Sequence, residues 1–159
     1  MIAAVLKEIT PGEKRVAATP QTAKDLIKSG LTLRIESGAG AASYFSDEDY
    51  EEVGAKVLPD PTSTLKDADI ILKVSPATKA EIDIIPDKVA YVSLCQTTRE
   101  LELVKLLNSK KITGFSMHLI PRTTLAQSMD ALSSQANIAG YKSVLIGASH
   151  LPVYMPLLM

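Results

Sequence analysis

The chain has 159 residues, of which 46% are hydrophobic, and its 17 Lys and Arg residues nearly balance 18 Asp and Glu residues, for a formal net charge of −1. These values are typical of one ordinary soluble domain, and they provide no broad positive surface for a nucleic acid. The single cysteine, Cys95, excludes an intramolecular disulfide and any multi-cysteine metal site.

Short apolar runs alternate with segments of helical length, an order that predicts an α/β fold with an open parallel sheet covered by helices on both faces. In chain order, strands are expected over residues 2–6, 31–35, 55–58, 69–74, 89–94 and 112–117. Helices are expected over residues 20–29, 47–53, 62–66, 79–84 and 98–109, followed by a long helix that begins near Ser134.

Local sequence patterns support several helix starts. Thr19 precedes a proline, which is the pattern of an N-cap followed by the first helical residue. Ser46 with Asp49, and Thr97 with Glu100, both have the spacing of a capping box. We therefore expect helices to begin directly after Thr19, Ser46 and Thr97.

The glycines contain neither a Gly-x-Gly-x-x-Gly fingerprint nor a Walker pattern. The nearest approach is Gly38-Ala39-Gly40, after the second expected strand, and it lacks the third glycine. We interpret this segment as a tight turn. A nucleotide-binding subdomain of the usual kind is therefore not expected within these 159 residues.

Four other features have ordinary structural explanations. The acidic residues between 47 and 52 suit a solvated helix start, because the helix dipole favours acids in the first turn. His118 ends a strand, where a catalytic base would be well placed, although a lone histidine is more often structural. His150 lies in an apolar tail, and Cys95 is expected to be a small buried hydrophobe. No metal site is expected.

The last sixteen residues, from Val144 to Met159, contain no Asp, Glu, Lys or Arg. This stretch is shorter than the ~20 residues that a membrane-spanning helix needs, and Pro152 and Pro156 interrupt it. The N-terminus has the features of neither a signal peptide nor a transit segment. We therefore expect a cytoplasmic chain without a membrane span.

The segment over residues 121–135 concentrates polar side chains after the last expected strand. Gln127, Asp130 and Ser133 recur at three-residue steps, which would bring an amide, a carboxylate and a hydroxyl together on one face of a helix. An amphipathic helix with a solvated face would look the same. Arg122 and the carboxyl-end location, where open α/β sheets bind ligands, favour a site for a carboxamide or carboxylate.

The run from Arg122 to Tyr141 closely resembles the signature segment of the alpha subunit of proton-translocating NAD(P) transhydrogenases. Lys7-Glu8 and residues 13–20 are similar to the start that transhydrogenases share with alanine dehydrogenases. Residues 38–40 and 69–74 fit as well, so the resemblance covers the whole chain. The chain is identified on these residues as a member of the alanine dehydrogenase/transhydrogenase N-terminal domain family.

The resemblance implies a flavodoxin-like domain over residues 1–133. Residues 134–159 would be a connecting helix and an apolar tail that lead to a Rossmann NAD-binding domain absent from this chain. The implied protein is a homodimer that works with membrane and NADP(H)-binding subunits, peripheral on the cytoplasmic, inner face of a membrane. Its reaction would be hydride transfer from NADH to NADP+, coupled to proton movement, and the isolated chain is expected to be inactive.

The resemblance also assigns the candidate site residues. Arg122, Gln127, Asp130 and Ser133 correspond to the residues expected at the nicotinamide of NAD(H), both as cofactor-binding and as catalytic groups. Hydride transfer requires no protein acid or base, so their expected contribution is to position the ring.

Two alternatives remain open at this point. The first is a fragment of an alanine-dehydrogenase-like enzyme, in which Arg15 and Lys73 would bind the substrate. Ser93 stands where that branch has a histidine, which disfavours amino-acid oxidation, and the two cations could equally belong to a structural polar network. The second alternative is a stand-alone binding domain without catalytic activity.

Overall fold

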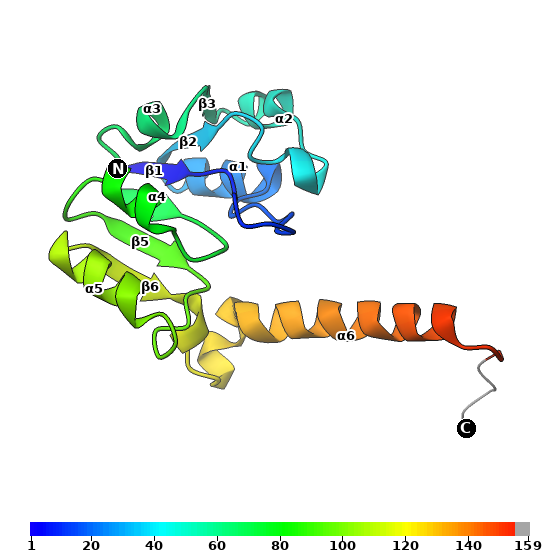
Figure 1. The fold of residues 1–159 in the computed structure, drawn as a ribbon. Helices are drawn as coiled ribbons and strands as arrows, with labels where there is room; N and C mark the ends of the chain where they lie inside the picture. Colours follow the sequence, from blue (N-terminus) through cyan, green and yellow to red (C-terminus); the bar gives the residue numbers. More distant parts are fainter. Residues whose placement is uncertain (155–159) are drawn as a thin grey trace. The chain divides into compact units, whose positions relative to one another are not determined.

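The computed structural model describes residues 1–154. The chain forms two compact units, which we call unit 1 (Met1–Ser116) and unit 2 (Met117–Met159). Unit 1 contains a parallel sheet with helices on both faces, and unit 2 contains short 3-10 helices and one long α-helix (Figure 1).

The sheet of unit 1 has six strands, each parallel to its neighbours, in the order β3-β2-β1-β4-β5-β6. Without the short edge strand β3, the other five strands have the order of flavodoxin-like folds. The predicted open parallel sheet is therefore confirmed. The strands are β1 (Ile2–Val5), β2 (Thr32–Glu36), β3 (Lys56–Leu58), β4 (Ile70–Leu72), β5 (Ala90–Ser93) and β6 (Thr113–Ser116).

Two apolar clusters, one on each face of the sheet, form the core of unit 1. One cluster joins the sheet to Ala23 of α1 and Tyr50 of α2, and the other joins it to Leu65 of α3, Ile82 of α4 and Leu103 of α5. Helices thus cover both faces, as predicted. The helices of unit 1 are α1 (Pro20–Lys28), the 3-10 helix η1 (Ala41–Ser43), α2 (Asp47–Glu52), α3 (Pro61–Leu65), α4 (Lys79–Ile84) and α5 (Leu101–Ser109).

Two of the three predicted helix starts are confirmed. The side chains of Thr19 and Ser46 cap α1 and α2, both within capping boxes. The predicted cap at Thr97 is wrong, because α5 begins at Leu101 and its N-cap position is occupied by Glu100. The Glu100 carboxylate instead accepts a hydrogen bond of 3.0 Å from the Gln96 amide and stabilises the turn that precedes the helix.

Unit 2 begins with the 3-10 helices η2 (Met117–Leu119) and η3 (Thr124–Met129) and continues into α6 (Ala131–His150). The predicted long helix is therefore present, and it starts slightly before Ser134. The segment over 121–135 does not form the single helix that the three-residue spacing of Gln127, Asp130 and Ser133 predicts. A 3-10 helix ends at Met129, and Asp130 leaves helical geometry with φ −73° and ψ 79° before α6 begins.

Side chains of α6 are exposed from Ala136 to His150. Within residues 1–154, no helix combines the length and the hydropathy needed to cross a membrane. The first part of the charge-free tail, up to His150, is helical. Its last residues, 155–159, lie outside the described part of the chain.

Candidate functional site

The sheet of unit 1 has a topological switch point between β1 and β4. These strands are neighbours, but α1 follows β1 onto one face of the sheet and α4 follows β4 onto the other. In open α/β sheets, ligands bind in the crevice outside the carboxyl ends of such strands. Here polar residues follow both strands closely: Lys7 and Glu8 after β1, and Lys73 and Ser75 after β4.

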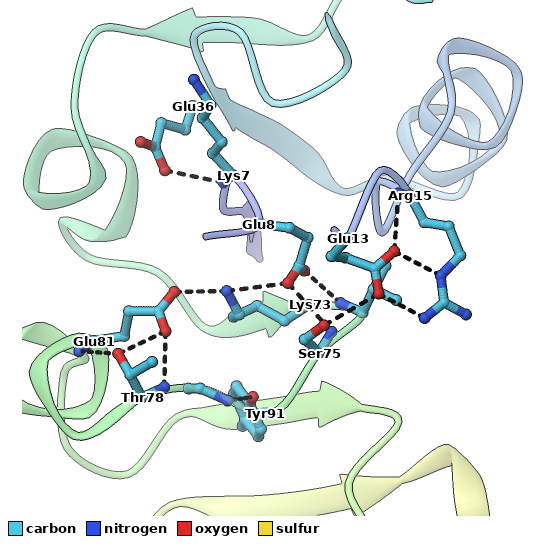
Figure 2. A network of polar contacts seen from close by, with 12 residues as sticks. Lys7, Glu8, Glu13, Arg15, Glu36, Lys73, Ser75, Thr78, Glu81 and Tyr91 are labelled. Atoms are coloured by element: carbon cyan, nitrogen blue, oxygen red, sulfur yellow. Dashed lines mark hydrogen bonds and ion pairs between the residues drawn. The ribbon is translucent and has the colours of Figure 1, made fainter. Parts of the chain in front are cut away.

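The centre of this polar region is a buried lysine held between two carboxylates (Figure 2). Lys73 Nζ lies 2.6 Å from Glu81 Oε1 and 3.4 Å from Glu8 Oε2. The side chains of Lys73 and Glu8 are only 1% and 3% exposed. Because an unpaired buried charge is strongly unfavourable, these three groups depend on one another. The contact ties the ends of β1 and β4 to α4.

Backbone amides complete the coordination of Glu8. Its Oε1 accepts a hydrogen bond of 2.6 Å from the amide of Val74, and its Oε2 accepts one of 3.2 Å from the amide of Ser75. Together with Lys73, these donors satisfy a carboxylate that water scarcely reaches. Glu8 therefore accepts two backbone N–H groups that follow the carboxyl end of β4.

Arg15 belongs to the same network through Glu13. The guanidinium donates to both oxygens of Glu13, with Nε to Oε1 at 2.8 Å and Nη2 to Oε2 at 2.6 Å. The Ser75 hydroxyl donates to Glu13 Oε2 at 3.2 Å and so joins this pair to the end of β4. The hydrogen bond from Arg15 is the main reason why the pKa of Glu13 is lowered to about 2.

The start of α4 holds the other side of the lysine. Glu81 Oε2 accepts hydrogen bonds from the amide and the hydroxyl of Thr78, while the Thr78 hydroxyl caps the amide of Glu81. Burial opposes ionisation of Glu81, but the hydrogen bonds from Lys73 and Thr78 outweigh it and lower the pKa. Tyr91 accepts from the amide of Ala77, and burial raises its pKa to about 12. Hydrogen bonds from Thr78 and Lys73 therefore fix the position of Glu81 on this side of the network.

A cavity of about 210 Å³ opens beside the network. Its walls are Lys7, Glu8, Glu13 and Arg15 from the segment after β1, with the backbone turn that starts at Gly38 opposite. That turn has the expected form, since Gly38 adopts a positive φ of 71°. The volume of the cavity limits any ligand there to a small molecule or ion.

Arg15 and Lys73, the two predicted substrate-binding residues, are thus brought into one network, and each is held by carboxylates. Sequence reasoning missed those partners, Glu8, Glu13 and Glu81, as parts of a site. The signal for Glu81 was present, because Thr78 and Glu81 have capping-box spacing. No comparable local pattern predicts that Glu8 lies against a residue more than sixty positions away.

The second predicted group lies in unit 2 at the start of α6. Asp130 caps this helix: its Oδ1 accepts from the amide of Ser133 at 2.9 Å, and its Oδ2 accepts from the Ser133 hydroxyl at 2.6 Å. The Ser133 hydrogen bonds, and after them the charge of Arg122, hold the pKa of Asp130 below its usual range. Gln127, in the last turn of η3, has an exposed side chain.

The break at Asp130 changes how these four residues are related. Asp130 and Ser133 touch, and Arg122 acts on the carboxylate through its charge. Gln127 is linked through its backbone carbonyl, which accepts a hydrogen bond from the Asp130 amide at 3.4 Å. All four side chains lie at or near the surface. The result is an exposed anionic carboxylate with a cation and an amide nearby in the sequence.

The remaining residues considered in the sequence are Cys95, the two histidines and Ser93. Burial raises the pKa of the Cys95 thiol to about 12, which agrees with the expected buried hydrophobe. His118 lies in η2, and His150 Nδ1 lies 2.9 Å from the Ile146 carbonyl oxygen. Ser93, which stands where the resemblance places the histidine of the alanine dehydrogenase branch, is buried at the end of β5. Among residues 1–154, no three His, Cys, Asp or Glu side chains are arranged to hold a metal ion.

Comparisons with known proteins agree on one family. The family described as alanine dehydrogenase/PNT, N-terminal domain, matches residues 4–139. A Rickettsia prowazekii protein, named as the first portion of an NAD(P) transhydrogenase alpha subunit, is 37% identical over 97% of this chain and 41% of its own. The alanine dehydrogenase of Methanococcus maripaludis is 32% identical over 95% of this chain and 40% of its own.

Solved structures give the same answer. A crystal structure of transhydrogenase from Sinorhizobium meliloti superposes on this chain with a TM-score of 0.93 and 36% identity, over 100% of this chain and 47% of that one. The chain therefore spans about two fifths of the length of these two curated relatives, and just under half of this solved relative.

Proposed function

The chain belongs to the alanine dehydrogenase/PNT N-terminal domain family, and from this membership we propose that it is a component of a proton-translocating NAD(P) transhydrogenase. In this proposal, hydride passes from NADH to NADP+ while protons cross a membrane. The named relatives support the transhydrogenase branch, since those called transhydrogenase have higher identity than those called alanine dehydrogenase.

Within that reaction, Arg122, Gln127, Asp130 and Ser133 would orient the nicotinamide of NAD(H). The observation that carries this assignment is the cap at the start of α6, where Ser133 fixes both oxygens of Asp130. A carboxamide has two N–H donors and one carbonyl acceptor, and an ionised Asp130 with the Gln127 amide offers groups that match both. The residues present therefore fit a nicotinamide.

When bound, the dinucleotide supplies the hydride, so these residues need only bind and orient. Ser133 and Arg122 lower the pKa of Asp130 further, so its carboxylate can accept a hydrogen bond without taking a proton. Ser133 donates to Asp130 and keeps lone pairs with which to accept. A side chain already held in place loses little freedom when it binds, which favours accurate positioning.

The proposal also includes partners. A Rossmann domain would hold the rest of NAD(H), and membrane and NADP(H)-binding subunits would complete the complex, with this chain as a peripheral component of a homodimer. The relatives' length supports further polypeptide, because this chain covers only 41% of the Rickettsia protein. The name of that relative describes it as one portion of a divided alpha subunit, which supports partner chains.

The test is Asp130→Asn, introduced into the chromosomal gene so that the chain keeps its natural partners. Asparagine is as good an N-cap as aspartate, so α6 should still form. NADH-dependent reduction of NADP+ by isolated membranes should fall roughly 10²-fold, the cost of a misplaced reactant. The matched control is Glu102→Gln, which removes an exposed carboxylate of α5 and should leave the rate unchanged.

Either of two results would contradict the proposal. A wild-type rate in Asp130→Asn membranes would remove the residue assignment. If wild-type membranes that contain the chain transfer no hydride between the two nucleotides, the proposed transhydrogenase activity is contradicted.

A second candidate rests on the switch-point network. Arg15 and Lys73 lie in one network beside a cavity of small-molecule size, as an alanine-dehydrogenase-like substrate site would need. The test is NADH oxidation that depends on both pyruvate and ammonia. Such activity, abolished by Arg15→Gln, would favour this candidate, and its absence from membranes active in transhydrogenation would exclude it.

A further inference from the structure

A second hollow lies in unit 1 on the surface made by the start of α1, the end of η1 and the adjoining helix α2. Its volume is about 580 Å³, more than twice that of the cavity at the switch point. None of the candidate site residues lines it. Its lining is Thr19, Pro20 and Gln21 from α1, Tyr44 and Phe45 after η1, and Asp49, Glu52 and Val53 around α2.

Tyr44, at the rim of the hollow, is held in an unusual way. Its φ of 65° lies in the left-handed region, which is unfavourable for a bulky side chain. Its side chain is 96% exposed, the highest value among the large hydrophobic residues of the described chain. Packing within unit 1 therefore does not compensate for either the strain or the exposed ring. A partner that covers the ring would.

The floor of the hollow is Phe45, which packs against a buried tyrosine. Phe45 meets Tyr50 edge to face, with ring centroids 6.5 Å apart and an interplanar angle of 79°. Tyr50 is fully buried and donates a hydrogen bond of 2.8 Å to the carbonyl of Ala18, just before α1. Phe45 therefore rests on a fixed aromatic ring. An occupant would meet a preformed apolar surface, which favours binding because little has to be ordered.

The two charged residues that line the hollow, Asp49 and Glu52, are both acidic. Five of the six residues of α2 are acidic. Asp47 and Asp49 suit the first turn, and they accept hydrogen bonds from Ser37 and from the Ser46 amide. Glu51 and Glu52 lie in the last turn, where the helix dipole favours cations instead. No ion pair to these five carboxylates forms within residues 1–154.

We propose that this hollow docks a basic segment of a partner polypeptide. An arginine or lysine of that segment lies over the exposed ring of Tyr44, in the cation–π geometry that tyrosine accepts. The charged end of that residue meets Glu52 and Asp49, and aliphatic neighbours rest on Phe45 and Pro20. The charge complementarity identifies the occupant as basic, and the apolar floor identifies it as a polypeptide rather than a simple cation. The proposal is independent of the nicotinamide site in unit 2.

The experiment titrates the ¹⁵N-labelled 159-residue chain with the peptide acetyl-Gly-Arg-Leu-Arg-Pro-Arg-Gly-amide and follows amide shifts by NMR. Saturable shifts are expected for residues 19–21 and 44–53. A matched peptide with glutamate in place of each arginine should produce none. Shifts that do not saturate, or that spread over all acidic surfaces, would overturn the proposal.

Variants separate the hollow from general acidity. Tyr44→Gly removes the ring and also suits the left-handed backbone, so unit 1 should remain folded. It and Glu52→Gln should each weaken the peptide at least fivefold, while Glu102→Gln, with the same change in net charge as Glu52→Gln, should not. Three results would overturn the proposal. The first is equal weakening in Glu102→Gln, and the second is spermidine binding as tightly as the peptide. The third is a change in the amide shifts of the hollow when the chain alone is diluted, which would show that a second copy occupies it.

Discussion

Lys73 is a buried charged residue of unit 1 whose partners are both carboxylates. Its ammonium group is the cation shared by two carboxylates, Glu8 and Glu81, at the carboxyl ends of the central strands. Two acids around one base leave this buried group with a negative balance. Backbone amides at Val74 and Ser75 offset that balance, so the arrangement uses the chain's own dipoles to hold charge in the interior.

Replacement of Lys73 by methionine should therefore destabilise the fold strongly. The variant keeps the length of the side chain but leaves two carboxylates without their cation, for which we expect a loss of about 3–5 kcal/mol in the free energy of unfolding. Urea denaturation followed by circular dichroism measures this. Lys105→Met is the matched control: its pair with Glu102 is exposed, so the expected change is below about 1 kcal/mol. Equal losses in both variants would contradict the interpretation.

The lowered pKa of Glu13 predicts how the free energy of unfolding of unit 1 depends on pH. Its pKa is about 2 in the folded chain, against an ordinary value of 4.5, chiefly because Arg15 donates to its carboxylate. A carboxyl with a lowered pKa in the folded state stabilises the fold above its unfolded value and loses that contribution as the pH falls. The free energy of unfolding should therefore decrease as the pH falls from 4.5 to about 2.

The measurement is a series of urea titrations across that range. Glu13→Gln should reduce the slope of stability against pH, because the titrating group is gone. Arg15→Gln should also reduce it, because the main cause of the shift is gone. A slope that stays at its wild-type value in both variants would mean that other carboxyls control the acid response.

At the scale of elements, the sequence predicted the existence of every described strand and α-helix, because short apolar runs alternate with segments of helical length. Unbroken apolar runs such as Ile70–Leu72 are readable because both faces of the sheet are covered. Where the prediction failed, two local rules competed. Glu100 could cap a helix with Thr97 or close a turn with Gln96, and in the structure it closes the turn.

The caps of α4 and α5 make this difference measurable. Thr78→Ala removes the side chain that caps α4 and also positions Glu81, so it should cost about 1–2 kcal/mol of unfolding free energy. Thr97→Ala, at the cap expected from sequence, should cost less than about 0.5 kcal/mol, as for a surface change. Chemical denaturation of the two variants compares them directly. A larger loss in Thr97→Ala would show that Thr97 does cap the helix.

The candidate site could also be predicted only where its residues lie close together in the sequence. Arg122, Gln127, Asp130 and Ser133 were found because they lie close together in one recognisable run. Their three-residue spacing suggested one helical face, yet Asp130 serves as a cap and turns the chain between two helix types. Capping competes with helix propagation at aspartate, and only the fold decides between them. The network of Glu8, Glu13 and Glu81 could not be read locally at all.

At the scale of the whole molecule, the two units should differ in local stability. Both apolar clusters belong to unit 1, whereas the side chains of α6 are exposed from Ala136 onward. In hydrogen exchange of the 159-residue chain, amides of β1 and β4 should therefore be protected far longer than those of residues 136–150. Equal protection would show that α6 is packed against something in solution, and a concentration series would tell whether that is another copy.

The position of β1 also has a consequence for how the chain is made. β1 emerges from the ribosome before the other five strands of the sheet, yet it lies in the middle of that sheet, and its partner β4 is more than sixty residues away. Pairing at such sequence separation is slow, because a long loop must close before the contact can form. During synthesis, the apolar first strand can pair with β2 on one side but must wait on the other. The first strand of the sheet to be translated is thus among the last to be fully enclosed, and until then the nascent chain needs protection from aggregation.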